Sequence, residues 1–297
     1  MLAQKNEDRF KILLADDGSE HARAASALVG DLPFPAGCEI VVLRAFASTQ
    51  AGDLAPLENA LNQTCAHLKE KGLQVKPELL LGSPAEKVVE YAEQFRPDLI
   101  VVGAKGLRAT FGILLGGVAQ QVVEYACCPV LVVRAPYIAL RQILLVTDGS
   151  PSSHQAMQYL GKLPLPDSVR LQVMHVLPPP PIPIVLQNTS FGAMQVPIPE
   201  QLSEVEATSR AKEEEDGKAL LEQAVTSLQT LGLAATGVLK RGDAATEIIE
   251  YVKEKKIDLI VTGSRGLSQI RSWLMGSVSR KLVHYSGCSV LVVRCLY

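Results

Sequence analysis

The stretch from Asp258 to Val278 reads DLIVTGSRGLSQIRSWLMGSV, and it decides the fold. A short apolar run from Leu259 to Thr262 ends in a glycine turn, and a stretch with helical spacing follows it. The turn has the pattern Gly-x-x-Gly, nine residues, then Gly-Ser, at Gly263, Gly266, Gly276 and Ser277. A strand followed by a glycine turn and a helix start can bind phosphate through backbone N–H groups and the helix N-terminus. The pattern therefore predicts a phosphate-binding turn.

A near copy of this stretch, DLIVVGAKGLRATFGILLGGV, runs from Asp98 to Val118. KILLADDGSEHARAA (11–25) likewise matches QILLVTDGSPSSHQA (142–156), and VVEYACCPVLVVRA (122–135) matches LVHYSGCSVLVVRC (282–295). Matching residues are 131 positions apart at Lys11 and Gln142 but 160 positions apart at Asp98 and Asp258. The second copy therefore carries an insertion of 29 residues between these points. Such a repeat predicts two domains, 1–138 and 139–297, joined by a short linker.

Each copy reads as alternating strands and helices. Nearly continuous apolar runs are typical of strands covered on both faces, hence of a mostly parallel sheet between helices. The predicted strands of the first copy are Ile12–Ala15, Glu39–Phe46, Val75–Leu81, Leu99–Val102 and Val130–Arg134, and its predicted helices are Glu20–Val29, Ala55–Lys71, Pro84–Gln94 and Gly116–Ala126. Ser19 and Ser150 are expected N-caps. The fold class is α/β, with two duplicated five-stranded parallel-sheet domains.

The insertion of the second copy follows a predicted strand at Leu171–Leu177. It begins with Pro178–Pro199, which holds seven prolines and can be neither a helix nor a central strand. We expect an extended surface segment that packs on the body, with a proline-rich ligand for another protein as the alternative. One long acidic helix, Glu200–Leu231, is expected next, with its charge run as a solvated face.

Composition excludes several classes of protein. The 297 residues are 47% hydrophobic and 20% charged, which is typical of globular domains. A net charge of -2 provides no basic field for nucleic acid or anionic membrane. The polar N-terminus lacks an apolar signal core, so we expect a cytoplasmic protein without a membrane partner. The six cysteines form no Cys-x-x-Cys, so we expect no metal site, and we expect Cys128 and Cys288, at matching positions before a predicted strand, to be small core residues.

Ligands of open α/β sheets bind beyond the carboxyl ends of the strands, where the strand order reverses. Asp148 follows a predicted strand and suits ribose hydroxyls, while Arg265 and Ser277 could donate to phosphate. The alternative is that the glycines serve only turns and tight helix–sheet packing. The sequence has no P-loop, no dinucleotide Gly-x-Gly-x-x-Gly and no nucleophile elbow. Because no acid/base pair is evident, we expect no dedicated catalyst.

Three motifs together resemble a known family: Asp-Gly-Ser at 17–19 and 148–150, the glycine loop, and the closing VLVVR strands. The chain resembles a tandem universal stress protein with two UspA-type domains. The resemblance implies a Rossmann-like fold of the adenine nucleotide alpha hydrolase type and, in the subgroup with this motif, binding of ATP, with ADP or AMP as alternatives and Mg²⁺ accompanying the nucleotide. The nucleotide-binding residues that it implies in the second copy are Thr147, Asp148, Val176, Thr262, Gly263, Arg265, Gly266, Gly276, Ser277 and Val278.

The same resemblance implies a weaker site in the first copy, because Gly117 stands where Ser277 supplies a hydroxyl. The counterparts are Asp16, Asp17, Ala45, Val102, Gly103, Lys105, Gly106, Gly116, Gly117 and Val118. Family members commonly dimerise through the fifth strand, so the two copies are expected to pair within one chain, with a further homodimer of whole chains. The implied function is a stress-response regulator with at most slow ATP hydrolysis. The alternative is a nucleotide-independent interaction module that uses the proline-rich segment and the acidic helix.

Overall fold

The computed structural model of the chain describes residues 9–35, 37–46, 54–107, 115–180, 200–266 and 275–294. The first half contains β1 (Lys11–Ala15), α1 (Glu20–Asp31), β2 (Glu39–Phe46), α2 (Ala55–Glu70), β3 (Gln74–Leu81), α3 (Pro84–Phe95), β4 (Leu99–Gly103), α4 (Gly117–Tyr125) and β5 (Val130–Val133). The second half contains β6 (Gln142–Val146), α5 (Pro151–Leu160), β7 (Arg170–Leu177), α6 (Glu200–Thr230), β8 (Ala235–Arg241), α7 (Ala244–Lys255), β9 (Leu259–Gly263), α8 (Ser277–Tyr285) and β10 (Ser289–Val293).

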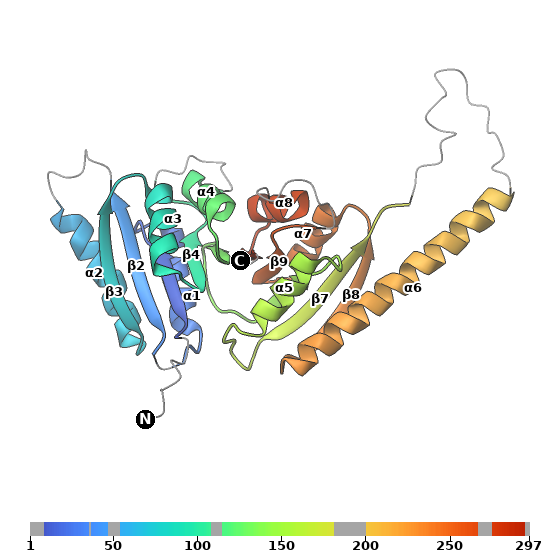
Figure 1. Cartoon of the computed structure of the whole chain (residues 1–297), viewed down its shortest axis with the longest axis horizontal. Helices are drawn as coiled ribbons and strands as arrows, with labels where there is room; N and C mark the ends of the chain where they lie inside the picture. Colours follow the sequence, from blue (N-terminus) through green and yellow to red (C-terminus); the bar gives the residue numbers. More distant parts are fainter. Residues whose placement is uncertain are drawn as a thin grey trace, which may run out of the picture.

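The strands form one sheet in the order β3-β2-β1-β4-β5-β10-β9-β6-β7-β8. Every neighbouring pair within a half is parallel, as the unbroken apolar strands predict. The two halves meet at β5 and β10, which are antiparallel, with Val132 opposite Val290. Figure 1 shows the halves side by side with this seam between them. The predicted α/β fold class is confirmed.

Side chains alternate between the two faces of the sheet, and each face has its own core. On one face, Ile12 and Leu14 of β1 pack in a cluster with buried residues of α1, α2, α5 and α6. On the other face, Leu13 belongs to a cluster that includes α3, α4, α7 and α8. Both clusters contain residues of both halves. Strands buried on both faces explain why their sequence shows no polar alternation.

Side-chain hydrogen bonds also tie the halves together beyond the strand pairing. Arg134 follows β5 and donates from Nη2 to the carbonyl oxygens of Val283 (2.8 Å) and His284 (3.3 Å) in the last turn of α8. In the opposite direction, Arg294 donates from Nη1 to Ala126 O after α4 (3.3 Å). The Tyr159 hydroxyl of α5 donates to Asp98 O of the first half (2.8 Å).

Most predicted elements begin and end within two residues of the observed ones. Both expected serine caps are present, since Ser19 Oγ accepts from Ala22 N and Ser150 Oγ from Ser153 N. The expected arrangement of residues 181–199 lies outside the described residues. Where the structure differs, it does so slightly: α1 continues to Asp31, two residues beyond the predicted end at Val29.

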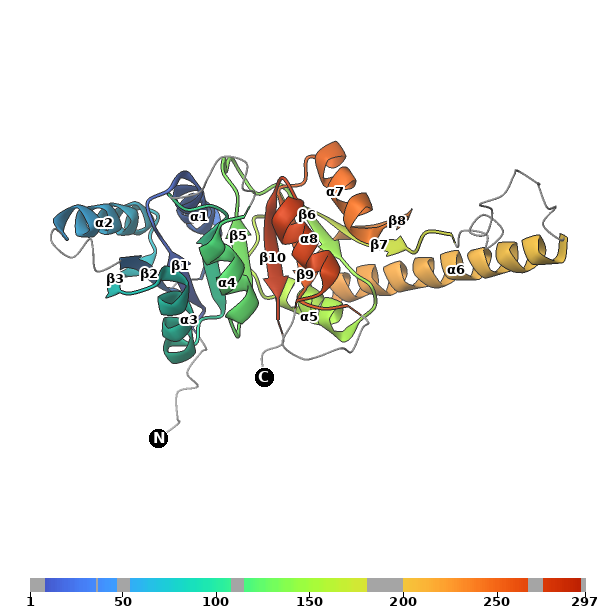
Figure 2. The same cartoon turned by 90° about the horizontal axis from the view of Figure 1, so that it is seen from above.

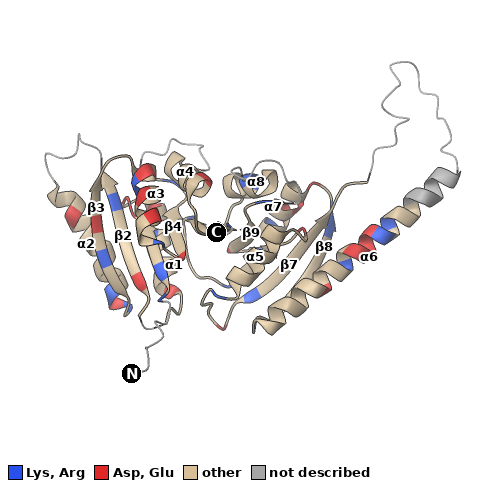
Figure 3. Ribbon diagram, in the orientation of Figure 1, with Lys and Arg blue, Asp and Glu red and all other residues tan. Residues whose placement is uncertain are grey.

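Helix α6 is the main departure from the symmetry of the duplication. It has 31 residues, whereas its counterpart α2 has 16. Its described side chains from 207 to 216 are exposed or half-exposed, and Gly217 is its first buried residue. Figures 1 and 2 show α6 extending beyond β7 and β8, and Figure 3 shows both acidic and basic residues along it. Among the helices that the structure describes, none combines the length and the apolar character needed to cross a bilayer.

Candidate functional site

A cavity opens in each half where the strand order reverses between β1 and β4, and between β6 and β9. In both halves, β1 or β6 is flanked by strands whose connections run to opposite sides, so loops separate at this point. We name these the first cavity and the second cavity after their halves. Their volumes are similar, about 250 Å³ and about 270 Å³.

The structure brings all ten predicted residues of the second copy around the second cavity. They come from the loop after β6, the end of β7, the end of β9 and the start of α8. Sequence reasoning missed five further lining residues, which are Val146, Ser153, Ala244, Ile248 and Ser279. Two of these belong to α7, whose position over the sheet edge could not be derived from the loop motif alone.

All ten predicted residues of the first copy likewise line the first cavity. The additional lining residues are Ala15, Leu43, Pro84, Val88, Leu115 and Ala119. Pro84 and Val88 of α3 take the places of Ala244 and Ile248 of α7, so the two cavities are built in the same way.

The cavities differ in their hydroxyl groups. Among its described lining residues the first cavity has no serine or threonine, whereas the second has Thr147, Ser153, Thr262, Ser277 and Ser279. Four of these five hydroxyls are already engaged. Thr147 Oγ1 donates to Ser153 Oγ (3.1 Å), which donates to Ser150 O (2.9 Å), and Ser279 Oγ donates to Gly263 O (2.7 Å) and lies 3.3 Å from Thr262 Oγ1. Ser277 lies at the first position of α8, is exposed and lines the cavity.

The glycines at the strand ends are explained by packing. A Cβ on Gly263 would lie 2.6 Å from the backbone carbon of Ser152, and one on Gly103 would lie 2.8 Å from Ala22 N. Contacts this short do not occur with real side chains, so α5 and α1 can approach the sheet only at glycine. For these two positions the packing interpretation of the motif is sufficient.

The second glycine of each loop makes room for an aspartate. A Cβ on Gly266 would lie 2.8 Å from Asp148 Oδ2, and one on Gly106 would lie 2.5 Å from Asp17 Oδ2. Asp17 also accepts from Ser19 N and Leu107 N, both at 3.0 Å. The loop and the aspartate after the first strand are therefore packed together, which places a carboxylate beside each loop backbone.

Helices α4 and α8 begin at the cavities with their N-termini uncapped by side chains. Their N-cap residues are Gly116 and Gly276, and neither helix has a side-chain capping hydrogen bond. Unpaired N–H groups and the positive end of the helix dipole at such a terminus favour an anion. A Cβ on Gly276 would lie 3.3 Å from Arg265 Cα, so the turn leaves little space there, whereas one on Gly117 would meet nothing within 4 Å.

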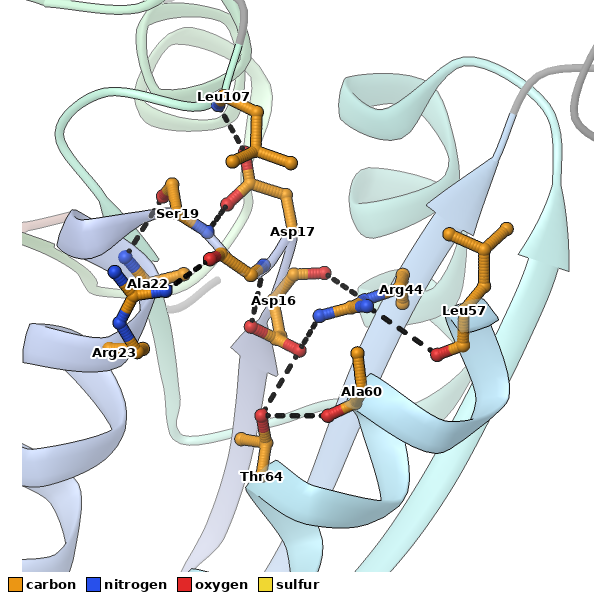
Figure 4. Close-up of polar contacts among 11 residues, drawn as sticks. Asp16, Asp17, Ser19, Ala22, Arg23, Arg44, Leu57, Ala60, Thr64 and Leu107 are labelled. Carbon is orange, nitrogen blue, oxygen red and sulfur yellow. Dashed lines mark hydrogen bonds and ion pairs between the residues drawn. The ribbon is translucent and has the colours of Figure 1, made fainter. Parts of the chain in front are cut away.

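Asp16, a predicted site residue of the first copy, points its carboxylate away from a ligand and onto Arg44 of β2. The ion pair joins Arg44 Nη2 and Asp16 Oδ2 at 2.5 Å, and both side chains are almost fully buried. Arg44 Nε also donates to Asp16 O (3.3 Å), and Thr64 Oγ1 of α2 donates to Asp16 Oδ2 (3.3 Å). Figure 4 shows the Arg44 guanidinium between β1 and α2. A buried charge needs such a partner, and this one occupies the Asp16 carboxylate.

The second half has neither the aspartate nor the arginine of this pair. Thr147 stands for Asp16 and donates from Oγ1 to Ser153 Oγ (3.1 Å), while His175 stands for Arg44, with Nδ1 2.9 Å from Thr147 O. Sequence reasoning missed the Asp16–Arg44 pair. A signal for it was available, because the acid and the base are both present in one copy and both absent from the other.

The cysteines and histidines of the described chain form no catalytic or metal-binding cluster. No group of three or more His, Cys, Asp or Glu within the described residues could hold a metal ion. Burial raises the pKa of the Cys128 and Cys288 thiols to about 12, which keeps them protonated and unreactive at neutral pH.

Comparison with known proteins agrees with the repeat. A sequence profile described as "Universal stress protein family" matches residues 9–134 and again 139–294. Universal stress protein YxiE of Bacillus subtilis is 32% identical over 156 residues, which are 52% of this chain and 98% of that protein. A universal stress protein of Thermus aquaticus is 35% identical over 160 residues, again 52% of this chain and 98% of that protein. A crystal structure of an Archaeoglobus fulgidus universal stress protein covers 96% of each chain with a TM-score of 0.61 and 20% identity, which supports the fold.

Proposed function

Because the chain belongs to the universal stress protein family, we propose that it is a nucleotide-binding regulator whose second cavity binds ATP. The observation that supports this most is the start of α8 beside the glycine loop. There an uncapped helix N-terminus, the Ser277 hydroxyl and Arg265 line one cavity with Asp148. An anionic chain of phosphates fits this donor set, and the carboxylate fits a sugar hydroxyl.

Each lining residue has a role in this proposal. Thr147 and Asp148 flank the adenine and ribose, and Val176 and Thr262 contact the base. The loop and helix start hold ribose and phosphates through Gly263, Arg265, Gly266, Gly276, Ser277 and Val278. ADP or AMP would use the same groups with fewer phosphate contacts, and Mg²⁺ would enter with the phosphates.

The first cavity is proposed as the weaker site. Lys105 keeps a positive charge in the place of Arg265, and the backbone donors at the start of α4 are conserved in geometry. It lacks a hydroxyl at Gly117, and the Asp16 carboxylate is engaged by Arg44. Loss of one hydrogen bond to a charged group weakens binding by about 1.5–3 kcal/mol.

We propose regulation, with at most slow hydrolysis, as the role of this binding. The described lining residues of both cavities contain no histidine, and their carboxylates are engaged by the loop backbone or by Arg44. No group is thus placed as a general base for water. The proposal also includes pairing of the halves through β5 and β10 and a homodimer of whole chains. It further includes a cytoplasmic location and the domain limits 1–138 and 139–297.

Titration calorimetry with ATP, with and without Mg²⁺, tests the proposal on the full chain. One nucleotide per chain should bind more tightly than any second one. Ser277→Ala should weaken the tighter site by about tenfold or more, since a hydrogen bond to phosphate is lost. The matched control is Ser286→Ala, at the other end of α8, which should leave affinity unchanged. No binding at millimolar ATP would overturn the proposal.

One observation favours the alternative of an interaction module. The 207–216 part of α6 buries none of its described side chains fully, and Figure 2 shows that α6 extends beyond β7 and β8. On this alternative, α6 and the proline-rich segment bind a partner protein without nucleotide. Deletion of residues 181–199 should then abolish association with a cross-linked partner, whereas the ATP proposal expects the same deletion to leave nucleotide affinity unchanged.

A further inference from the structure

A second pocket of the first half lies on the opposite face of the sheet from the first cavity. We name it the rear pocket. It is enclosed by the turn after β1, by α1 and by α2, and its volume is about 370 Å³, within the range of small-molecule sites. The first cavity, by contrast, is covered by α3 and α4. The buried Asp16–Arg44 pair lies between the two spaces (Figure 4).

The chemistry of the rear pocket is cationic. Arg23 and Arg44 both line it, together with the donors Gln63, Thr64 and His67. None of its described lining residues is acidic. Arg44 is balanced by Asp16, but Arg23 is exposed and its only contact with a described group is the 2.7 Å hydrogen bond from Nη1 to Gly18 O. One uncompensated guanidinium therefore faces a space bordered by further donors, an arrangement suited to a planar or tetrahedral oxyanion.

A buried hydroxyl in the wall supports a polar occupant independently of these charges. Ser26 of α1 is 4% exposed and lines the pocket, and its Oγ has no hydrogen-bond partner among the described residues. A buried hydroxyl without a partner is costly, by about 1–3 kcal/mol, so such groups are rare in native structures. A ligand oxygen in the rear pocket would satisfy it.

The duplication provides an internal comparison. The corresponding space in the second half, between α5 and α6, has a volume of only about 120 Å³. In the repeat registers, His154 replaces Arg23, Met157 replaces Ser26 and His175 replaces Arg44. On α6, Leu220 and Ala224 replace Ala60 and Thr64. The second half thus has a smaller space at the same place, with Met157, Leu220 and Ala224 in place of three residues of the rear pocket, and both guanidiniums are confined to the first half.

We propose that the rear pocket binds a small metabolite through a carboxylate or phosphate group. Arg23 neutralises the anion, Gln63 donates a hydrogen bond, and Ser26 in the pocket wall offers a hydroxyl, while Arg44 borders the site already paired with Asp16. This site is separate from the proposed nucleotide site, because it lies behind the sheet and uses none of the residues of the first or second cavity.

The test uses the full chain, labelled for NMR, with inorganic phosphate and succinate as separate probes. Binding should shift the amide signals of Ser26, Gln63 and Thr64 in a saturable way, and the tighter probe identifies the anionic group. Arg23→Ala should weaken binding by about tenfold, while Arg23→Lys should retain most of it. The matched control is His154→Ala, at the equivalent exposed position of α5, which should not change the affinity.

Three results would overturn the site. Shifts confined to the starts of α4 and α8 would assign the probes to the nucleotide cavities. Equal affinity in Arg23→Ala and wild type would remove the guanidinium from recognition, and no saturable shift with either probe would leave the pocket without an anion. A failure of ATP binding leaves these outcomes unaffected, since neither probe contains a nucleotide.

Discussion

The two copies differ most clearly at one residue, Gly117 in the first half and Ser277 in the second. Both open a helix at a cavity, and both positions are exposed. Because a Cβ at Gly117 meets nothing within 4 Å, a serine fits there without strain. The first cavity thus lacks a hydroxyl at this position because the residue is glycine, and not because a serine side chain would not fit.

Gly117→Ser should therefore strengthen nucleotide binding in the first half by about tenfold, through one added hydrogen bond to phosphate. Titration calorimetry of ATP on the full chain would show the weaker site approaching the tighter one. Gly117→Ala is the control, because it adds the same Cβ without the oxygen. Equal gains from alanine and serine would assign the effect to helix stability.

Asp16 and Arg44 give a second prediction at the residue scale. Arg44→Met removes the counter-charge and leaves the Asp16 carboxylate buried, which should destabilise the protein by about 3–5 kcal/mol. The double change Asp16→Thr with Arg44→His reproduces the Thr147 and His175 arrangement of the second half, leaves no buried carboxylate, and should recover much of that loss. Denaturant unfolding measures both. A double variant no more stable than Arg44→Met would mean that the ion pair is not the cause.

At the scale of elements, helix α7 is capped at its N-terminus by the ionisable side chain of Asp243. Asp243 Oδ1 accepts from the N–H (3.0 Å) and the hydroxyl (2.8 Å) of Thr246. Hydrogen bonds from the Thr246 side chain and backbone, with a smaller contribution from Lys281, hold the pKa of Asp243 below its ordinary value. Because the pKa of Asp243 is lower in the folded state than in the unfolded state, its ionised carboxylate stabilises the fold at any pH above the unfolded-state pKa. This stabilisation is lost as the pH falls through the folded-state pKa.

Asp243→Ala should cost about 1 kcal/mol at pH 7, because α7 loses its cap. The cost should shrink once pH falls below about 3.9, where the free carboxylate begins to take up its proton. Urea unfolding at pH 7 and pH 3 measures the difference. Asp243→Asn is the control, since asparagine still caps the helix but does not titrate. A cost independent of pH would show that the charge plays no part.

The same scale shows what sequence could and could not predict. Strand and helix positions followed from apolar runs, caps such as Ser19, and the repeat itself, because these signals are local. The rule for parallel sheets predicted the edge of the sheet where the cavities lie, and the resemblance to the family supplied the set of lining residues. The rear pocket and the Asp16–Arg44 pair could not be predicted in this way. They depend on the register that sets Ala15 beside Leu43, and hence Asp16 beside Arg44.

At the scale of the whole molecule, the seam turns two similar halves into one sheet. Strands β5 and β10 would be open edges in separate halves, and edges of this kind favour association. Their pairing leaves β3 and β8 as the outer strands of the described sheet. Arg134 of the first half adds a side-chain link to the second half, because its guanidinium donates to two carbonyl oxygens at the C-terminal end of α8. The helix dipole also favours a cation at this end.

Arg134→Met should therefore weaken the seam while keeping the apolar stem of the side chain. We expect a loss of about 1–3 kcal/mol, because two carbonyl oxygens lose a charged donor. Denaturant unfolding followed by separate probes in each half would also show whether the halves still unfold together. Arg141→Met is the control, since this exposed residue bonds to other described residues through its backbone N–H and carbonyl oxygen and not through its side chain. If both variants lowered stability equally, the seam would be held by the strand pairing alone, and Arg134 would contribute no more than a surface charge.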